Sequence, residues 1–400
     1  MPVGTAFHER TFRLSDSLNF RDWSGYYAAG SYETTHEHEY NAIRNAAALI
    51  DVSPLYKYQV SGPDSLRLIQ RVVARDAARL AVGQMFYCCW CDERGKVIDD
   101  GTIARLAESS YRWTAAEPNL RWFRENAAGM DVSIEDVSES LAALAVQGPL
   151  SARLLAPLAG PELGNLRYYR LMRARVGGAD VEISRTGYTG DLGYEIWIPR
   201  EHALAVWDAV AAEGKACGTQ AAGMLALDVA RIEAGLILQD VEYVSSRRAL
   251  IESQKYSPFE IGLGRLVDLK KEAFVGRAAL VEEERRSGAR RLVGLEMDWA
   301  EVEEICERAG LPPQAPTVAS RVHVPVYRGG RHVGKATSTA WSPVLKKLIA
   351  LASVERDQEK PGTRLEFEYT VEAVRHKVGA RVAPLPFFNP PRKTATPAGA

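Results

Sequence analysis

A glycine-rich turn followed by a strand with one acidic residue is the stretch of this sequence best suited to binding a ligand. It runs from Arg185 to Trp197, and Gly187, Gly190 and Gly193 recur there at every third position. Such glycines permit positive φ angles and a close approach of the backbone to a ligand. The alternation that follows places Glu195 opposite its apolar neighbours, where a carboxylate can accept two parallel N–H donors. The alternative is a surface hairpin whose glutamate is solvated.

Two adjacent aspartates form a second candidate for chemistry. Asp99 and Asp100 lie in residues 96–103, which we expect to be the return strand of a hairpin that begins with a strand at 83–90. Neighbouring residues of a strand face opposite ways, so both carboxylates cannot point into one site.

The residues that most often bind metals are not arranged to do so. Cys88 and Cys91 have Cys-x-x-Cys spacing, but no second pair or nearby histidine accompanies them, so we expect reduced cysteines buried in a strand. His36 and His38 are two positions apart and would not share a helix face, which favours a solvated helix start. The sequence therefore predicts no metal site.

Composition narrows the class of protein. The 400 residues are 46% hydrophobic and 25% charged, which predicts a globular chain with two or three cores. The net charge of −1 offers no long-range attraction for nucleic acid or an anionic membrane. The first 19 residues lack the apolar segment of a signal peptide, and no apolar run approaches 18 residues, so we expect a cytoplasmic protein.

Helices and strands alternate through the first 290 residues, which predicts mixed α+β sheets covered by helices. In the last helix of this region Asp228 and Arg231 are three apart and Gly235 provides a stop, so Arg231 can be read as half of a surface ion pair. The expected helices are 34–48, 65–73, 118–128, 150–158, 201–213 and 224–234, and the expected strands are 56–61, 83–90, 96–103, 132–137, 141–146 and 194–198.

The C-terminal part has a different pattern. A charged stretch at 282–291 reads as a linker or an exposed helix, and we place a domain boundary near residue 290. Short alternating runs separated by glycines and prolines then predict a small antiparallel barrel over 291–385. Residues 386–400 are expected to form an extended or disordered tail. The expected barrel strands are 292–296, 322–327, 332–338, 348–353, 365–369 and 376–382.

Six short motifs occur in an order that resembles the glycine-cleavage T-protein (aminomethyltransferase) superfamily, across nearly the whole chain. The resemblance implies a three-domain cloverleaf around a central cavity for tetrahydrofolate, with the barrel as third domain. Residues 1–290 would then hold two interwoven α+β domains, the inner one at about 52–145. The motifs are Asp51-Val52-Ser53, residues 97–100, 144–149 and 187–195, Arg231 to Leu236, and Ser342 to Lys347.

The resemblance also implies roles for individual residues. Asp100 matches the catalytic carboxylate beside the folate nitrogens, and Glu195 matches the acceptor of the pterin's paired N–H groups. Arg231 matches an arginine of the same cavity. Aromatic walls for a flat cofactor are expected from Tyr87, Tyr188 and one of Tyr168 or Tyr169, of which we favour Tyr169; ordinary core packing is the alternative for these rings.

Several positions depart from the T-protein pattern. Pro54 replaces a usual histidine, and Leu227 and Gln239 replace an arginine and a tyrosine, while residues 257–267 resemble the folate-dependent demethylase branch. We therefore expect methyl transfer to N5 of tetrahydrofolate from a small O-, S- or N-methylated donor, without metal and without a lipoyl carrier protein. The alternatives are an aminomethyltransferase that forms 5,10-methylenetetrahydrofolate and a folate-binding protein without turnover.

Overall fold

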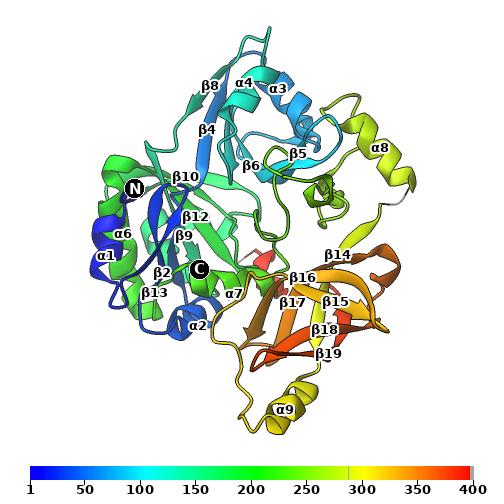
Figure 1. The fold of residues 1–400 in the computed structure, drawn as a ribbon. Coiled ribbons are helices and arrows are strands. Elements are labelled where there is room, and N and C mark those ends of the chain that lie inside the picture. Colours follow the sequence, from blue (N-terminus) through cyan, green and yellow to red (C-terminus); the bar gives the residue numbers. More distant parts are fainter. Residues whose placement is uncertain (287, 397–400) are drawn as a thin grey trace.

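The computed structural model describes residues 1–286 and 288–396. They form three packed units, with an inner α+β unit at the top of Figure 1, an outer α+β unit at the left and a β-barrel at the lower right. The predicted α+β class with a C-terminal antiparallel barrel is confirmed. Within these ranges no helix combines the length and apolar character needed to cross a membrane.

The inner unit is a five-stranded antiparallel sheet in the order β5-β6-β7-β4-β8 with two helices packed on it. Its centre is aromatic, because Trp90 and Trp113 meet edge to face at 5.3 Å and Phe123 stacks on Trp113 at 3.9 Å between centroids. The elements are β4 (Tyr56–Ser61), α3 (Ser65–Val72), β5 (Met85–Cys91), β6 (Val97–Ala107), β7 (Ser110–Ala115), α4 (Leu120–Asn126) and β8 (Ser133–Asp136).

The outer unit is a six-stranded sheet in the order β10-β11-β12-β9-β3-β13, in which β13 runs parallel to β3. Ile196 of β12 packs toward α5 and α6, while Trp197 packs toward α2, α7 and the barrel. Glu195 therefore lies on the α7 side. The elements are α2 (Glu37–Asn45), β3 (Ala48–Asp51), β9 (Leu141–Gln147), α5 (Ser151–Ala159), β10 (Leu171–Val176), β11 (Ala179–Ser184), β12 (Gly193–Pro199), α6 (Ala203–Gly214), β13 (Gln220–Ala221) and α7 (Met224–Glu233).

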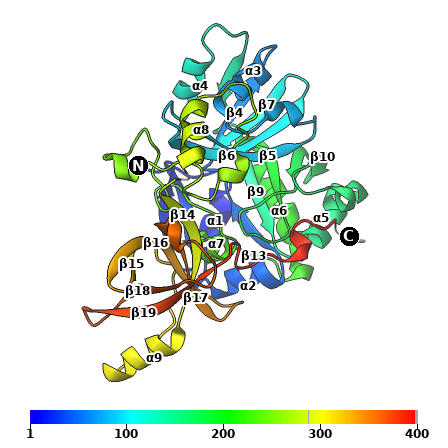
Figure 2. The same ribbon diagram turned by 90° about the vertical axis from the view of Figure 1, so that its right-hand side faces the viewer.

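The third unit is a closed barrel in the order β14-β17-β16-β15-β18-β19. Every predicted barrel strand is present, and α8 precedes the barrel while α9 projects from its far end in both views (Figures 1 and 2). The elements are α8 (Arg277–Arg286), β14 (Arg290–Met297), α9 (Trp299–Arg308), β15 (Val324–Arg328), β16 (Arg331–Ser342), β17 (Lys347–Glu355), β18 (Arg364–Val371) and β19 (Val374–Ala383).

A buried carboxylate joins the outer unit to the barrel. Glu233, at the end of α7, accepts two hydrogen bonds from Arg44 of α2 at 2.9 and 2.6 Å and one from Tyr40 at 2.6 Å. The hydroxyl of Ser342, at the end of β16, donates to the same carboxylate at 2.5 Å. Since these side chains are buried, the network fixes α7 against both neighbours.

Three expectations need correction. The helix expected at 34–48 is shorter and consists of α2 at 37–45, because residues 48–51 pair with β9 as strand β3. The N-terminal helix α1 (His8–Arg13), the hairpin of β1 (Asn19–Trp23) and β2 (Tyr26–Ser31), and α9 were not predicted. The tail was expected to be extended or disordered, yet Arg392 pairs with the buried carboxylate of Asp191 at 2.6 Å and residues 391–393 form a short helical turn. Residues 397–400 lie outside the described residues.

Candidate functional site

Two tyrosine hydroxyls hold the carboxylate of Asp100. Tyr87, on the neighbouring strand β5, donates to Oδ2 at 2.6 Å, and Tyr243, from the segment after α7, donates to Oδ1. Burial raises the pKa of Asp100, while the two hydroxyls act in the opposite direction. The carboxylate is therefore positioned where the inner unit meets the segment that follows α7.

Asp99 faces the opposite side of β6, as strand alternation predicts. It is fully buried and accepts hydrogen bonds from the backbone N–H of Asp100 at 2.7 Å, the N–H of Glu117 at 3.0 Å and the amide of Asn119 at 2.8 Å. Burial, followed by the charge of Asp100, raises the pKa of Asp99 well above its usual value. Asp99 thus acts inside the inner unit as an anchor for the backbone that carries Asp100.

Glu195 lies on a central strand of the outer sheet, between Ser184 of β11 and Ala145 of β9. This position excludes the surface-hairpin alternative. Thr186 donates its hydroxyl to Oε2 at 2.6 Å, and within the described chain Oε1 has no hydrogen-bond donor and neither oxygen has an ion-pair partner. Burial raises the pKa of Glu195, with Thr186 and the charge of Arg112 opposing it. One acceptor oxygen of this carboxylate thus remains without a donor among the described residues.

Two of the three turn glycines make room for a buried side chain of the protein, whereas the sequence suggested that they allow a ligand to approach. Only Gly190 has a positive φ, of 72°. A Cβ on Gly187 or Gly193 would lie 1.9 or 2.2 Å from the side-chain oxygen of Gln147, whose amide donates to the carbonyls of Thr186 and Tyr194. The positive φ that this spacing suits therefore occurs at one of the three glycines, and at the other two the missing Cβ makes room for a buried glutamine.

Arg231 and Tyr188 are tied to the segment that follows α7. The guanidinium of Arg231 is fully buried and contacts Glu242 at 2.9 Å, Ser338 of the barrel at 2.7 Å and Asp228 at 3.4 Å. The surface ion pair expected as the alternative for Arg231 is thus wrong. The hydroxyl of Tyr188 donates to the carbonyl of Ile237. Both side chains therefore hold this segment in place, and contact of either with a cofactor stays a prediction.

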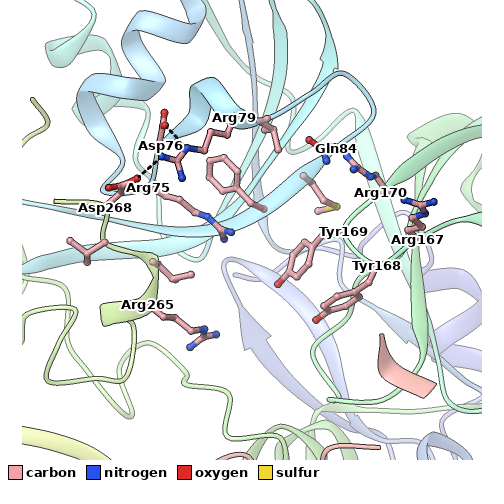
Figure 3. Close-up of a pocket in the computed structure, with 15 residues that line it drawn as sticks. Arg75, Asp76, Arg79, Gln84, Arg167, Tyr168, Tyr169, Arg170, Arg265 and Asp268 are labelled. Atoms are coloured by element: carbon pink, nitrogen blue, oxygen red, sulfur yellow. Dashed lines mark ion pairs between the residues drawn. The ribbon is translucent and has the colours of Figure 1, made fainter. Parts of the chain in front are cut away.

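Tyr168 and Tyr169 form an aromatic pair, with ring centroids 4.5 Å apart, on the wall of a cleft of about 500 Å³ (Figure 3). Tyr169 has a φ of 58°, and its carbonyl accepts the N–H of Met85, which joins this wall to β5. Burial raises the pKa of Tyr168; among charged neighbours, Arg265 lowers it and Glu195 raises it. The aromatic pair therefore forms the wall of the cleft that meets β5.

The cysteines and histidines do not form a metal centre. Cys88, Cys89 and Cys91 are free and buried in β5, as predicted. His36 is buried and precedes α2, so its expected solvation was wrong, whereas His38 is exposed and contacts Glu33 at 2.8 Å. In the part of the chain that is described, no group of three or more His, Cys, Asp or Glu is arranged for a metal ion.

Tyr243 is the principal residue that the sequence did not suggest. It is separated from Asp100 by 143 positions and lies in an irregular segment without helical or strand periodicity. Beside it, the side-chain oxygen of Gln239 lies 3.4 Å from its hydroxyl, and the amide nitrogen Nε2 of Gln239 is buried without a described hydrogen-bond partner. The only available signal was that Gln239 departs from the T-protein pattern.

Comparisons with known proteins identify the class to which this fold and site belong. The protein-family model of the GCVT N-terminal domain matches residues 15–271, and the family model of the glycine cleavage T-protein C-terminal barrel domain matches residues 290–389. The chain belongs to the glycine-cleavage T-protein family.

Individual relatives agree with this assignment. An aminomethyltransferase of Saccharopolyspora erythraea is 35% identical over 97% of this chain and 98% of its own length. A trimethylamine-oxide aldolase of Ruegeria pomeroyi is 35% identical over 98% of this chain, but the chain spans only 47% of that relative. The crystal structure of aminomethyltransferase T of the glycine cleavage system from Bartonella henselae superposes with a TM-score of 0.82 at 23% identity, over 97% of this chain and 99% of the other, which supports the same fold.

Proposed function

We propose that the protein transfers a methyl group from a small O-, S- or N-methylated donor to N5 of tetrahydrofolate. The observation that carries this proposal is the environment of Asp100. Its carboxylate accepts two tyrosine hydroxyls, and Gln239, a position of departure from the T-proteins, lies beside one of them. Gln239, which differs from the T-protein pattern, thus contacts Tyr243, one of the two tyrosines that bind the candidate catalytic carboxylate.

The donors and acceptors of the site fit a folate. A pterin presents an amino group and a ring N–H in parallel, and Glu195 has an oxygen without a protein donor. The unpartnered amide of Gln239 supplies a buried donor beside Tyr243. Tetrahydrofolate, when bound, would supply the nitrogen that accepts the methyl carbon.

The chain's own contribution is orientation and control of a proton. Tyr87 and Tyr243 fix both oxygens of Asp100, so the carboxylate can orient a donor without reorganising. Burial, which raises the pKa of Asp100, also makes it easier for this group to hold a proton near the departing oxygen, sulfur or nitrogen. An ether oxygen needs such help more than a sulfonium, which is already a good leaving group.

The comparisons support two candidate reactions, methyl transfer from a small donor and aminomethyl transfer from a carrier protein. The Ruegeria relative is named for trimethylamine oxide, a small N-methylated compound, which favours a donor of that class here. Aminomethyltransferases match the chain over nearly their whole length, which keeps transfer of an aminomethyl group from a lipoyl carrier as the second candidate.

One incubation separates these candidates. Purified protein is mixed with tetrahydrofolate and a panel of O-, S- and N-methylated donors, and the folate products are measured by mass spectrometry. We expect 5-methyltetrahydrofolate from at least one donor, with no carrier protein present. Formation of 5,10-methylenetetrahydrofolate and ammonia only with an aminomethylated lipoyl carrier would establish the second candidate. Methylene product from a small donor without the carrier would contradict methyl transfer, because the carbon is then more oxidised.

A further inference from the structure

A glutamine, a tyrosine and an aspartate follow one another where the inner unit meets the segment after α7. The hydroxyl of Tyr243 donates to Oδ1 of Asp100, and the side-chain amide of Gln239 lies 3.4 Å from the same hydroxyl. Gln239 and Tyr243 are both buried, so water does not separate them from solvent-free contact. The three side chains therefore form a row that ends at the candidate catalytic carboxylate.

The number of hydrogens in this row fixes how its members can bind one another. The hydroxyl of Tyr243 has a single hydrogen, and an ionised carboxylate can only accept, so this hydrogen goes to Asp100. The phenolic oxygen and the side-chain oxygen of Gln239 would then face each other as two acceptors. Meanwhile the nitrogen Nε2 of Gln239 is buried without a hydrogen-bond partner among the described residues, which is unfavourable for an N–H donor.

A half-turn of the amide of Gln239 removes the contact between two acceptors. The two ends of a side-chain amide have nearly the same shape, so the hydrogen-bond partners decide its orientation. With Nε2 toward Tyr243, the amide donates to the phenolic oxygen while the hydroxyl still donates to Asp100. The amide oxygen takes the former place of the nitrogen, and a buried carbonyl oxygen without a donor is more often tolerated than a buried N–H without an acceptor.

The backbone holds Gln239 and Tyr243 in this arrangement. The N–H of Asp240 donates to the carbonyl of Tyr243 at 2.7 Å, which closes the turn between the two side chains. The carboxylate of Glu242 accepts from the fully buried guanidinium of Arg231 at 2.9 Å, which ties the same turn to α7. The row of hydrogen bonds is therefore supported by the protein without any ligand.

The surroundings of Asp100 make the tyrosine hydroxyls its main source of stabilisation. Burial raises the pKa of this carboxyl, and the hydroxyls of Tyr243 and Tyr87 oppose that effect. Within the described chain no lysine or arginine forms an ion pair with Asp100. The titratable side chains around it, on its own strand and on the elements packed against it, are Asp99, Tyr87, Cys88, Cys89, Tyr188 and Tyr243.

We propose that Gln239 is a positioning residue whose amide donates to the phenolic oxygen of Tyr243 and, through this hydroxyl, stabilises the ionised carboxylate of Asp100. A hydroxyl that accepts a hydrogen bond becomes a stronger donor, because successive hydrogen bonds polarise one another. The hydrogen-bonded row follows from the geometry, whereas its consequence for methyl transfer rests on the proposed function. Since Gln239 departs from the T-protein pattern, the resemblance to that family does not imply this role.

The test measures the titration of Asp100 itself. Protein labelled with carbon-13 at its aspartate carboxyl groups is titrated by NMR, and the signal of Asp100 is identified by its absence in Asp100→Asn. Gln239→Met keeps the length of the side chain but has no N–H, so we expect it to raise the titration midpoint of Asp100 by about half a pH unit. If the amide oxygen faced the hydroxyl instead, its removal would leave Tyr243 entirely to Asp100, and the midpoint would fall.

Two further variants show whether the effect passes through Tyr243. Tyr243→Phe should raise the midpoint by itself, and adding Gln239→Met to it should change nothing more, because the connecting hydroxyl is gone. Gln239→Leu, a second apolar replacement, should give the same rise as Gln239→Met and separates the lost N–H from a change in packing. Gln358→Met alters another buried glutamine, which accepts from Arg328 at 2.7 Å in the barrel, and should leave the midpoint unchanged.

The outcomes separate this inference from the proposed function. An unchanged or lower midpoint in Gln239→Met, or an equal rise when Tyr243→Phe is already present, would overturn the inference. In single-turnover methyl transfer, the limb of the pH profile that reports Asp100 should move to higher pH by the same half unit, with the KM for the donor within about twofold of the parent. A parent that transfers no methyl group from any donor would refute the proposed function, and the NMR titration would still decide the inference.

Discussion

Replacing Asp100 by asparagine is the most direct test of the candidate catalytic group. The amide has nearly the same shape, but it has one acceptor oxygen and no charge. One of the hydroxyls of Tyr87 and Tyr243 keeps its acceptor, and the other faces an NH2 group and must rotate to accept from it. We expect a stability cost of about 1–3 kcal/mol, because one buried hydrogen bond to a charged group is replaced.

The expected loss of turnover is larger than this structural cost. A positioned acid or base typically contributes about 10²–10⁴-fold, which corresponds to about 3–5 kcal/mol of activation free energy. Folate affinity should change little, because Asp100 is not the expected pterin acceptor. The assay is formation of 5-methyltetrahydrofolate under single-turnover conditions, with folate affinity measured separately by calorimetry. A larger penalty for an ether donor than for a sulfonium donor would indicate proton transfer rather than positioning.

Asp99→Asn is the matched comparison. Asp99 accepts three N–H groups, so its asparagine variant should lose stability by about 1–3 kcal/mol, while the turnover of folded protein stays close to that of the parent. Thermal unfolding measures the first quantity and kinetics per folded molecule the second. If Asp99→Asn abolished turnover in folded protein while Asp100→Asn left it intact, the assignment of Asp100 would be refuted.

Three further predictions follow from the structure. Glu195→Gln should weaken folate binding by roughly 2–4 kcal/mol in calorimetry, and an unchanged affinity would remove Glu195 from the pterin site. Glu233→Gln should lower the free energy of unfolding by about 3–5 kcal/mol, because the buried Arg44 loses the nearer of its two carboxylate partners and keeps only Asp191 at 3.7 Å, and a change below 1 kcal/mol in chemical denaturation would contradict the network's role. Burial lowers the pKa of Lys57 to about 8, so as the pH rises the native protein releases this proton before the unfolded chain does. The stability of the parent relative to Lys57→Met should therefore rise by about 3 kcal/mol between about pH 8 and the unfolded-state pKa near 10.5. A stability difference that stays constant across this pH range would show that Lys57 titrates normally.

Local patterns predicted the regular parts of the fold well. Helix 224–234 corresponds to α7 within one residue because Gly235, with a φ of 63°, provides a stop that can be read from the sequence. The barrel strands were found because alternation and turn residues are local signals. By contrast, residues 48–51 look like a continuation of a helix, and only pairing with β9 makes them a strand. Helix α9 had a readable signal in the spacing of its buried Val302, Ile305 and Cys306.

In the candidate site too, local patterns could be predicted from the sequence and long-range contacts could not. Strand alternation alone separated Asp99 from Asp100, and period-two spacing placed Glu195 on the face opposite Tyr194 and Ile196, which the structure shows to be the face toward α7. The contact between Tyr243 and Asp100 could not be predicted, because it depends on how two distant segments pack. Nor could the sequence show that the turn glycines accommodate the amide of Gln147, since that requires knowing which buried side chain lies beneath the turn.

The contact between Asp191 and the C-terminal segment has a consequence for the order of synthesis. Asp191, buried in the glycine-rich turn, lies 3.7 Å from Arg44 and 2.6 Å from Arg392, while Arg185 at the start of the turn donates to the carbonyl of Ala395. A ribosome adding 5–20 residues per second needs about 10–40 s to extend the chain from one end of this contact to the other. Through that interval Asp191 has only one of its two arginine partners, so the outer unit is expected to reach its full stability only after residue 392 has been added.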